Sequence, residues 1–335
     1  CPPLFKWTPH AKAQSIAEGA EKFALTSYPT TEFSAWAFAN AANSIGRVAV
    51  PMFIMMSGAL IIGRAIPDWG SFFKHRSLVF LRPYLFGTIF YIVIGPTIGT
   101  SWPSPSQAVY QIMSGTAAYH LYFLPILFIM YVIAPLLEKA DQIKTSNLVG
   151  VTAALFALAT IERHVAPAIP GIGYFSLGLA PSYVPYFIAG YLLHKRWRMP
   201  LGIAAAGLSI STLLTFTLAW KYSMPQSAYP YSPDTFLQYT SFNVIAQSLF
   251  AFGLMNAWKA NSLERYRSEI VLLSNATLGI YVLHLAFVEW IHGAFRKLGA
   301  TVSTSELIIA PLAIFIVSLF ITFGLRRVKL MRGFV

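Results

Sequence analysis

The sequence has 335 residues, of which 56% are hydrophobic and 11% are charged, and its formal net charge is +12. Soluble domains carry about 25% charged residues, so a single water-exposed globule cannot bury this much apolar surface, and lipid is the expected solvent. The excess of 24 Lys and Arg over 12 Asp and Glu is compatible with nucleic-acid binding, but positively charged cytoplasmic loops of a membrane protein explain it more simply. The single cysteine excludes an internal disulfide framework and a cysteine-based metal cluster.

Residues 1–45 form a polar segment that several prolines interrupt. Within it, residues 11–25 are expected to form a short surface helix, and residues 32–44 a more apolar helix that leads into the membrane. We assign residues 1–45 to an extracytoplasmic N-terminal segment.

Nine apolar segments follow, and each is close to the roughly 20 residues that cross a bilayer. Their expected bounds are 46–63, 77–99, 119–137, 147–163, 174–193, 201–220, 236–258, 270–292 and 306–325. The fifth contains SLGLAPSYVPYFIAGYLL, and its two prolines predict a kinked or broken helix. The pattern predicts an all-α, polytopic transmembrane helical bundle over residues 46–326, with a cytoplasmic tail over residues 327–335.

Lys and Arg are unevenly distributed between the two sides that nine spans would define. The first, third, fifth and seventh connections, together with the C-terminal end, hold two thirds of these residues. The positive-inside rule therefore places the C-terminus in the cytoplasm and residue 1 outside.

An outside N-terminal segment of this length needs an apolar element to carry it across the membrane. The sequence also begins with Cys1 and not with Met. We therefore expect one more transmembrane helix before residue 1, giving ten spans with both ends inside. A removed signal peptide is the alternative.

Polar residues inside apolar spans are costly and often functional. Arg47 is expected at the outer end of the first span, either as a snorkelling interfacial arginine or as a donor to an anionic or carbonyl group. Deeper in the same span, Ser57 and Gly58 form either a close helix contact or a place where a ligand approaches the backbone.

Two further spans carry histidines. His120, next to Tyr119, lies at the start of the third span. Either its hydrogen bonds are satisfied at the membrane interface, or it serves as an acid, a base or a hydrogen-bond donor. In the eighth span, Tyr281 and His284 are three residues apart and share a helical face; core packing is the alternative for both. The catalytic candidates are Arg47, His120 and His284, and the substrate-binding candidates are Ser57, Gly58, Tyr119 and Tyr281.

Two arginines near the inner end of the second span complete the candidate residues. Arg76 and Arg82 either flank the span as positive-inside charges or bind a phosphate-bearing cytoplasmic ligand. The sequence contains no phosphate-binding glycine loop, no zinc-type His-Glu helix and no GxSxG elbow. No His and carboxylate pair has convincing ligand spacing, so no metal is expected.

Three stretches, in this order, resemble the membrane-bound acyltransferase-3 family: RVAVPMFIMMSG, YHLYFLPILFIMYVIAPLL and LSNATLGIYVLHLAFVEW. The resemblance implies about ten transmembrane helices, acetyl-CoA as the cytoplasmic donor, and a hydroxyl of a surface glycan or its lipid-linked precursor as the acceptor. It also implies that a histidine and an arginine in the family's first helix take part in the reaction. No residue of this sequence matches either of them.

The sequence departs from the family pattern at three places. Arg76 and Arg82 are six residues apart, where many relatives have a pair two residues apart. Ala59 follows the Ser-Gly pair where an aromatic residue is common, and Tyr122 replaces the usual tryptophan.

The expected function is that of an acetyl-CoA-dependent O-acetyltransferase in the bacterial inner membrane, with Arg82 and Arg76 near the donor phosphates. Its expected partners are acetyl-CoA, a glycan or lipid-linked sugar and membrane lipid, and not nucleic acid. A glycan or lipid transporter is the alternative, since proline-broken helices also suit transport, although no inverted repeat is visible. A non-catalytic relative is a third possibility.

Overall fold

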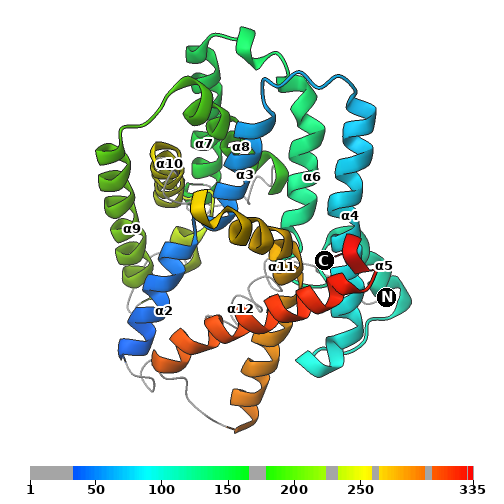
Figure 1. Cartoon of the computed structure of the whole chain (residues 1–335). Helices are drawn as coiled ribbons and strands as arrows, with labels where there is room; N and C mark the ends of the chain where they lie inside the picture. The colour runs from blue at the N-terminus through cyan, green and yellow to red at the C-terminus, as the bar shows by residue number, and fades with distance from the viewer. Residues whose placement is uncertain are drawn as a thin grey trace, which may run out of the picture. The chain divides into compact units, whose positions relative to one another are not determined.

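The computed structural model describes residues 33–165, 179–223, 233–258, 264–298, 304–329 and 331–334. In this part of the chain helices are joined by turns, and no β-strand occurs (Figure 1). The predicted all-α class is therefore confirmed. Of the two helices expected before the first span, residues 11–25 lie outside the described residues, and the other is observed as α2 (Phe33–Gly46).

Six helical stretches of the described chain are long and apolar enough to cross a membrane. They are Ser34–Ile61, Trp69–Ile98, Thr145–His164, Leu201–Tyr222, Glu264–Phe295 and Thr304–Arg327. The third, fifth and seventh predicted spans contain shorter helices, namely α6 (Phe123–Ile133), α8 (Leu179–Tyr191) and α10 (Phe242–Ala257). The chain is thus a multi-pass membrane protein, but the predicted count of nine spans is not confirmed.

The first of these stretches begins earlier than the sequence pattern predicted. It joins α2 to α3 (Ala49–Ile61) and starts at Ser34. Arg47 therefore lies inside the apolar stretch, at the turn between the two helices, and not at its beginning. A charged side chain in such a position needs a polar environment or a ligand.

The fifth predicted span is irregular, as its prolines indicated. Pro185 lies inside α8, and the chain passes at Tyr191 into a π-helix over Leu192–Arg196. Such wide turns often occur at functional sites.

The chain divides into two compact units. Unit 1 comprises residues 1–39, 79–124 and 269–335, and unit 2 comprises residues 40–78 and 125–268.

Unit 2 contains α3, α8, α10, α7 (Thr145–His164) and α9 (Leu201–Ser223). Within this unit α3 packs closely against α8 (Figure 1). A Cβ atom at Gly58 would lie 1.8 Å from the carbonyl oxygen of Phe187, and one at Gly190 would lie 1.9 Å from that of Met55. The two backbones can approach this closely because both positions are glycine.

A network of buried hydrogen bonds connects α10 to α9 and α2 in the same unit. Gln247 donates to the carbonyl of Ser44 and to the hydroxyl of Thr212, both at 2.9 Å. Asn243 donates to the hydroxyl of Thr215 at 3.0 Å and to the carbonyl of Phe236 at 2.7 Å. Lipid offers no hydrogen bonds, so buried polar side chains must pair with one another.

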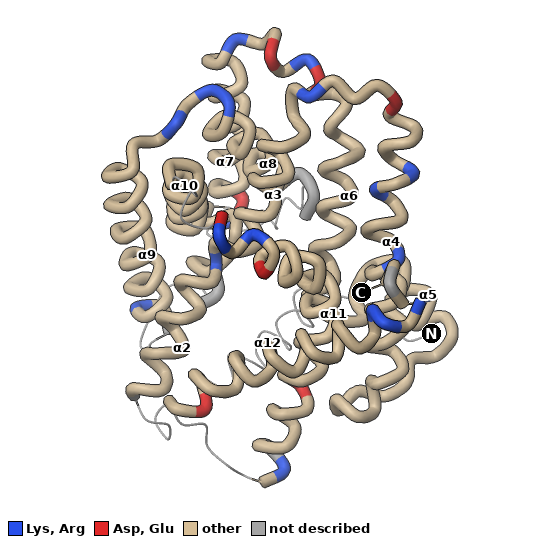
Figure 2. Tube along the Cα trace, viewed as in Figure 1, with Lys and Arg blue, Asp and Glu red and all other residues tan. Residues whose placement is uncertain are grey.

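Three connections meet at one end of unit 2. The backbone N–H of Gly63 donates to the carbonyl of Leu137 at 3.3 Å, and Arg196 donates to the carbonyl of Asp141 at 2.8 Å. Lys and Arg gather there (Figure 2). The distribution of Lys and Arg predicted that these connections, the first, third and fifth between the predicted spans, lie on one side of the membrane. The hydrogen bonds show that they lie next to one another.

Unit 1 contains most of α4 (Trp69–Ile94), α5 (Pro105–Ser114), α11 (Arg267–Leu298) and α12 (Thr304–Arg327). Its described core consists of Tyr91, Ala118, Leu121, Leu285 and Ala286. Helix α5 lies outside the nine predicted segments and begins with a capping box between Ser104 and Gln107.

Candidate active site

A cluster of aromatic side chains surrounds His120 in unit 1. His120 lies in the turn before α6, and only 8% of its surface is exposed. The centroid of its ring is 5.3 Å from that of Tyr91, 5.1 Å from Tyr281 and 5.1 Å from His284. The structure thus brings together three of the predicted residues, His120, Tyr281 and His284, from two distant parts of the sequence.

Both ring nitrogens of His120 are buried, and neither has a hydrogen-bond partner among the described residues. The backbone carbonyls of Tyr281 and Val282 lie close to the ring, but neither makes a hydrogen bond of normal geometry with a ring nitrogen. Buried polar atoms without partners are rare because they lose their hydration without compensation. The imidazole is therefore available to a ligand that enters the cluster.

His284 is held in one tautomer. Its Nδ1 lies 2.7 Å from the carbonyl oxygen of Tyr281 and 3.2 Å from that of Ile280. A carbonyl oxygen only accepts hydrogen bonds, so Nδ1 must carry the proton. In the neutral ring Nε2 is then unprotonated and can accept a proton, which is the arrangement of an oriented general base.

Tyr281 connects the two histidines through the backbone. Its hydroxyl donates a hydrogen bond to the carbonyl of His120, and its own carbonyl accepts from His284. Tyr119 lies on the other side of His120, with ring centroids 6.0 Å apart, and 45% of its surface is exposed. Tyr281 therefore positions the cluster, and Tyr119 borders it.

Tyr91 is a member of the cluster that the sequence analysis missed. Its hydroxyl donates to the carbonyl of Val282 at 2.8 Å and accepts from the N–H of Ala286 at 3.0 Å. In a regular α-helix these two backbone groups pair with each other. The hydroxyl thus bridges the turn of α11 that carries His284, and a tyrosine inside an otherwise apolar span was the available signal.

Small residues let α4 approach this part of α11. A Cβ atom at Gly87 would lie 3.0 Å from the Leu121 side chain and 3.1 Å from that of Val282. A larger residue would push these neighbours apart. Gly87 therefore allows Tyr91, one turn further along α4, to reach the backbone of α11.

The predicted residues of the first span belong to unit 2. The Nε of Arg47 is buried and has no hydrogen-bond partner among the described residues. The hydroxyl of Ser57 donates to the carbonyl of Phe53 at 3.0 Å, and Gly58 packs against the backbone of α8. The helix-contact alternative therefore holds for Gly58, while ligand contacts of Arg47 and Ser57 stay predictions.

The two candidate donor-binding arginines have different surroundings. The guanidinium of Arg76 lies 5.5 Å from the ring centroid of Phe72 and 5.3 Å from that of Tyr131, which indicates cation–π contacts. Arg82 is exposed, and its side chain lies beside Gly333. Arg76 belongs to unit 2 and Arg82 to unit 1, and a donor-binding role for these arginines stays a prediction.

Comparison with known proteins supplies the class of chemistry. Residues 22–327 match the model of the acyltransferase-3 family, which is described as an acyltransferase domain. No curated protein and no solved structure matches the chain. The matched range contains every residue of the cluster around His120. Within the described residues, no group of three or more His, Cys, Asp or Glu could hold a metal ion.

Proposed function

The chain belongs to the acyltransferase-3 family, and from this membership we propose that it is an integral-membrane O-acetyltransferase. The proposed donor is acetyl-CoA, and the proposed acceptor is a hydroxyl of a surface polysaccharide or of its lipid-linked precursor. The observation that carries the proposal is the buried imidazole of His120, with both nitrogens unpartnered, next to the oriented imidazole of His284.

The two histidines have complementary roles in the proposed reaction. The acceptor hydroxyl attacks the thioester carbonyl carbon, so that a C–O bond forms and the C–S bond breaks. His284 accepts the hydroxyl proton at Nε2 and returns it to the departing thiolate. An N–H of His120 donates to the carbonyl oxygen as negative charge develops on it.

The finer assignments follow from the sequence resemblance. From the run ANSIGRVAVPMFIMMSG we propose a likeness to the O-acetyltransferase that modifies enterobacterial common antigen, and with it a glycan hydroxyl as acceptor. Arg82 and Arg76 are proposed to bind the donor phosphates from the cytoplasm. The proposed location is the bacterial inner membrane with the C-terminus inside, and Arg47 is proposed to orient the acceptor.

The reaction can be tested with isotope-labelled acetyl-CoA. Membrane vesicles that contain the chain and a bacterial surface polysaccharide would be supplied with the label, and base-labile acetyl esters on the glycan would be measured by mass spectrometry. The wild type should form esters, and His120→Gln and His284→Asn should form far fewer. His75→Gln, at an exposed histidine of α4, is the matched control. Absence of ester with the folded wild type, or equal ester in all variants, would contradict the proposal.

A further inference from the structure

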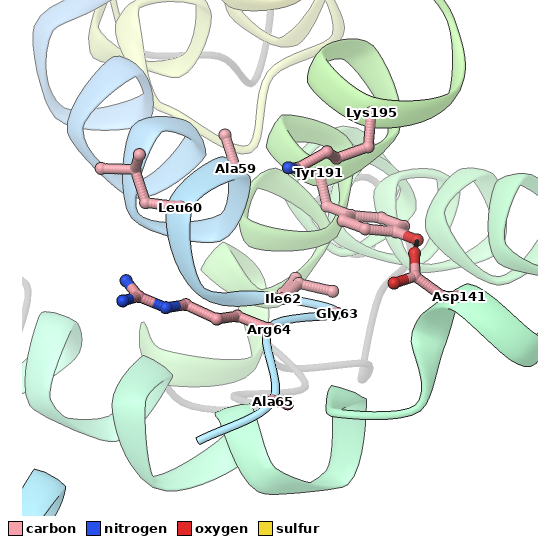
Figure 3. A pocket seen from close by; sticks show the side chains of 9 residues that line it. All are labelled: Ala59, Leu60, Ile62, Gly63, Arg64, Ala65, Asp141, Tyr191 and Lys195. Carbon is pink, nitrogen blue, oxygen red and sulfur yellow. Dashed lines mark hydrogen bonds between the residues drawn. The ribbon is translucent and has the colours of Figure 1, made fainter. Parts of the chain in front are cut away.

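A pocket of about 360 Å³ lies at the end of α3 in unit 2. Its lining includes the apolar residues Ala59, Leu60 and Ile62 and the charged residues Arg64, Lys195 and Asp141 (Figure 3). Its volume falls within the roughly 300–1,000 Å³ of small-molecule sites. None of the candidate residues of the acyl-transfer proposal lines it.

Two structural features form the pocket. Gly63 ends α3 with φ at +70°, and a Cβ atom there would lie 3.0 Å from the carboxylate of Asp141. This position therefore needs glycine both for its backbone conformation and for the space. On the opposite side, the π-helix that follows Tyr191 carries Lys195 to the rim.

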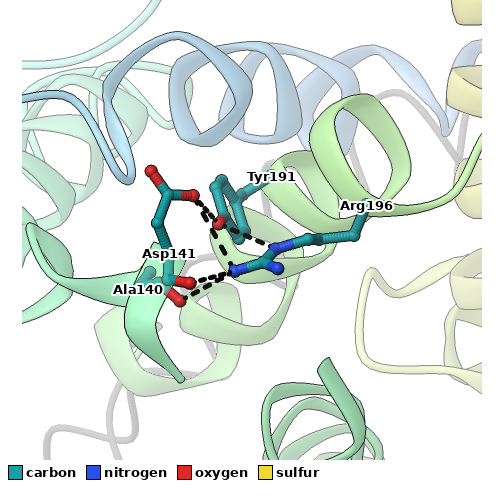
Figure 4. A network of polar contacts seen from close by, with 4 residues as sticks. All are labelled: Ala140, Asp141, Tyr191 and Arg196. Carbon is teal, nitrogen blue, oxygen red and sulfur yellow. Dashed lines mark hydrogen bonds and ion pairs between the residues drawn. The ribbon is translucent and has the colours of Figure 1, made fainter. Parts of the chain in front are cut away.

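The negative charge of Asp141 is already balanced within the protein. The hydroxyl of Tyr191 donates to the carboxylate of Asp141. The guanidinium of Arg196 lies 3.8 Å from the same carboxylate oxygen and donates to the carbonyls of Ala140 and Asp141 at 3.2 and 2.8 Å (Figure 4). The negative charge of Asp141 is thus balanced by a cation that does not line the pocket.

Arg64 and Lys195 consequently give the pocket its excess charge. Both are exposed, and neither side chain makes an ion pair or hydrogen bond with the residues that the structure describes. They approach the pocket from two different elements, the turn after α3 and the π-helix after α8. Two cations that line one pocket from separate elements favour an anion with several oxygen atoms over a single carbonyl.

An apolar surface continues from the pocket along α3. Leu60 and Phe53 are seven residues apart, share one helical face, and are 68% and 45% exposed. The pocket also lies at the end of an apolar stretch of membrane-spanning length, which is the depth at which lipid phosphates occur. A ligand that combines a phosphate with an apolar part fits both features.

We propose that this pocket is a phosphate-binding site in which Arg64 and Lys195 bind the phosphate group of an amphipathic molecule. The chemistry is shared by two sources, the headgroup of an anionic phospholipid and the phosphates of a soluble nucleotide cofactor. The site does not depend on the acyl-transfer proposal, because phosphate binding can be measured without turnover.

The test compares two double variants of the full chain in detergent. Arg64→Gln with Lys195→Gln removes the pocket cations, whereas Lys139→Gln with Lys144→Gln removes two exposed charges of a connection at the same end of unit 2. Binding would be measured by native mass spectrometry with phosphatidylglycerol, with phosphatidylcholine and with coenzyme A. Because each cation makes charge-assisted contacts with the phosphate, the pocket variant should bind about tenfold to thirtyfold more weakly.

The outcomes separate the two sources. Binding of phosphatidylglycerol that is weakened only in the pocket variant supports a lipid headgroup, and the same pattern with coenzyme A supports a nucleotide phosphate. If neither ligand binds, or if both double variants weaken binding equally, the pocket is not a phosphate site. Gel filtration checks folding, and the single substitutions Arg64→Gln and Lys195→Gln, at exposed positions, replace the pocket variant if it does not fold.

Discussion

The hydroxyl of Tyr281 donates a hydrogen bond to the backbone carbonyl of His120, although the two residues are 161 positions apart in the sequence. This bond fixes the turn before α6 to α11. It also places the imidazole of His120 beside that of His284, with ring centroids 5.1 Å apart.

Replacing His120 should lower the activity with little effect on stability. Because its ring nitrogens have no partner among the described residues, His120→Gln loses no hydrogen bond of the resting protein. Loss of a donor to a developing oxyanion typically costs about 10²–10³-fold in rate. Acetyl transfer should fall by this factor while the melting temperature in detergent changes little. Wild-type activity in a folded His120→Gln protein would remove His120 from the chemistry.

His284 offers a matched pair of substitutions. Asparagine can donate to the carbonyl of Tyr281 from the position of Nδ1 but has no base at the position of Nε2. His284→Asn should therefore lower the rate by about 10²–10⁴-fold, the usual contribution of a general base, with little loss of stability.

His284→Ala serves as the comparison, because it also removes the hydrogen bond to Tyr281. It should cost about 1 kcal/mol of additional stability. Rates measured together with thermal unfolding distinguish the two variants. An active His284→Asn enzyme is incompatible with the assigned base.

Tyr91→Phe tests the hydroxyl that bridges α11. The carbonyl of Val282 and the N–H of Ala286 lose this hydroxyl, but they can pair with each other as in a regular helix. The free energy of unfolding should therefore change by at most about 1 kcal/mol.

The turn that carries His284 should shift when the bridge is lost, and small displacements of this kind lower rates by about tenfold to a hundredfold. Acetyl transfer and thermal unfolding of Tyr91→Phe measure the two effects separately. An unchanged rate means that the bridge does not position His284.

Gly58→Ala tests the contact between α3 and α8. The new Cβ atom would lie 1.8 Å from the carbonyl oxygen of Phe187, so the two backbones must separate. This overpacking should lower stability by at least about 2 kcal/mol, measured by thermal unfolding in detergent.

Gly150→Ala is the control for that experiment. Gly150 lies within α7, and a Cβ atom there has no atom within 4 Å apart from the adjacent backbone of its own helix. This substitution should stabilise the helix by up to about 1 kcal/mol. Equal effects of the two substitutions would show that helix propensity, and not packing between α3 and α8, controls the outcome.

The sequence by itself determined the class of this protein. Its apolar segments predicted an all-α multi-pass membrane protein, because lipid requires every backbone hydrogen bond to be satisfied within a helix. Each of the nine segments overlaps with a helix of the described chain. The three family-like stretches predicted an acyltransferase, and the family match confirmed this class. The pairing of Tyr281 with His284 on one helical face also followed from their spacing alone.

Only the tertiary structure decided what these residues contact. Spacing along one helix could not show that His120 meets His284, since the two residues lie on different elements that only tertiary packing brings together. The spacing also could not show that the hydroxyl of Tyr91 bridges α11. For Gly58 it allowed two interpretations, and the structure decides between them because the backbone of Phe187 packs against this glycine. Local patterns specify helices through backbone hydrogen bonds and polarity, whereas these contacts depend on which small residues let two distant helices approach.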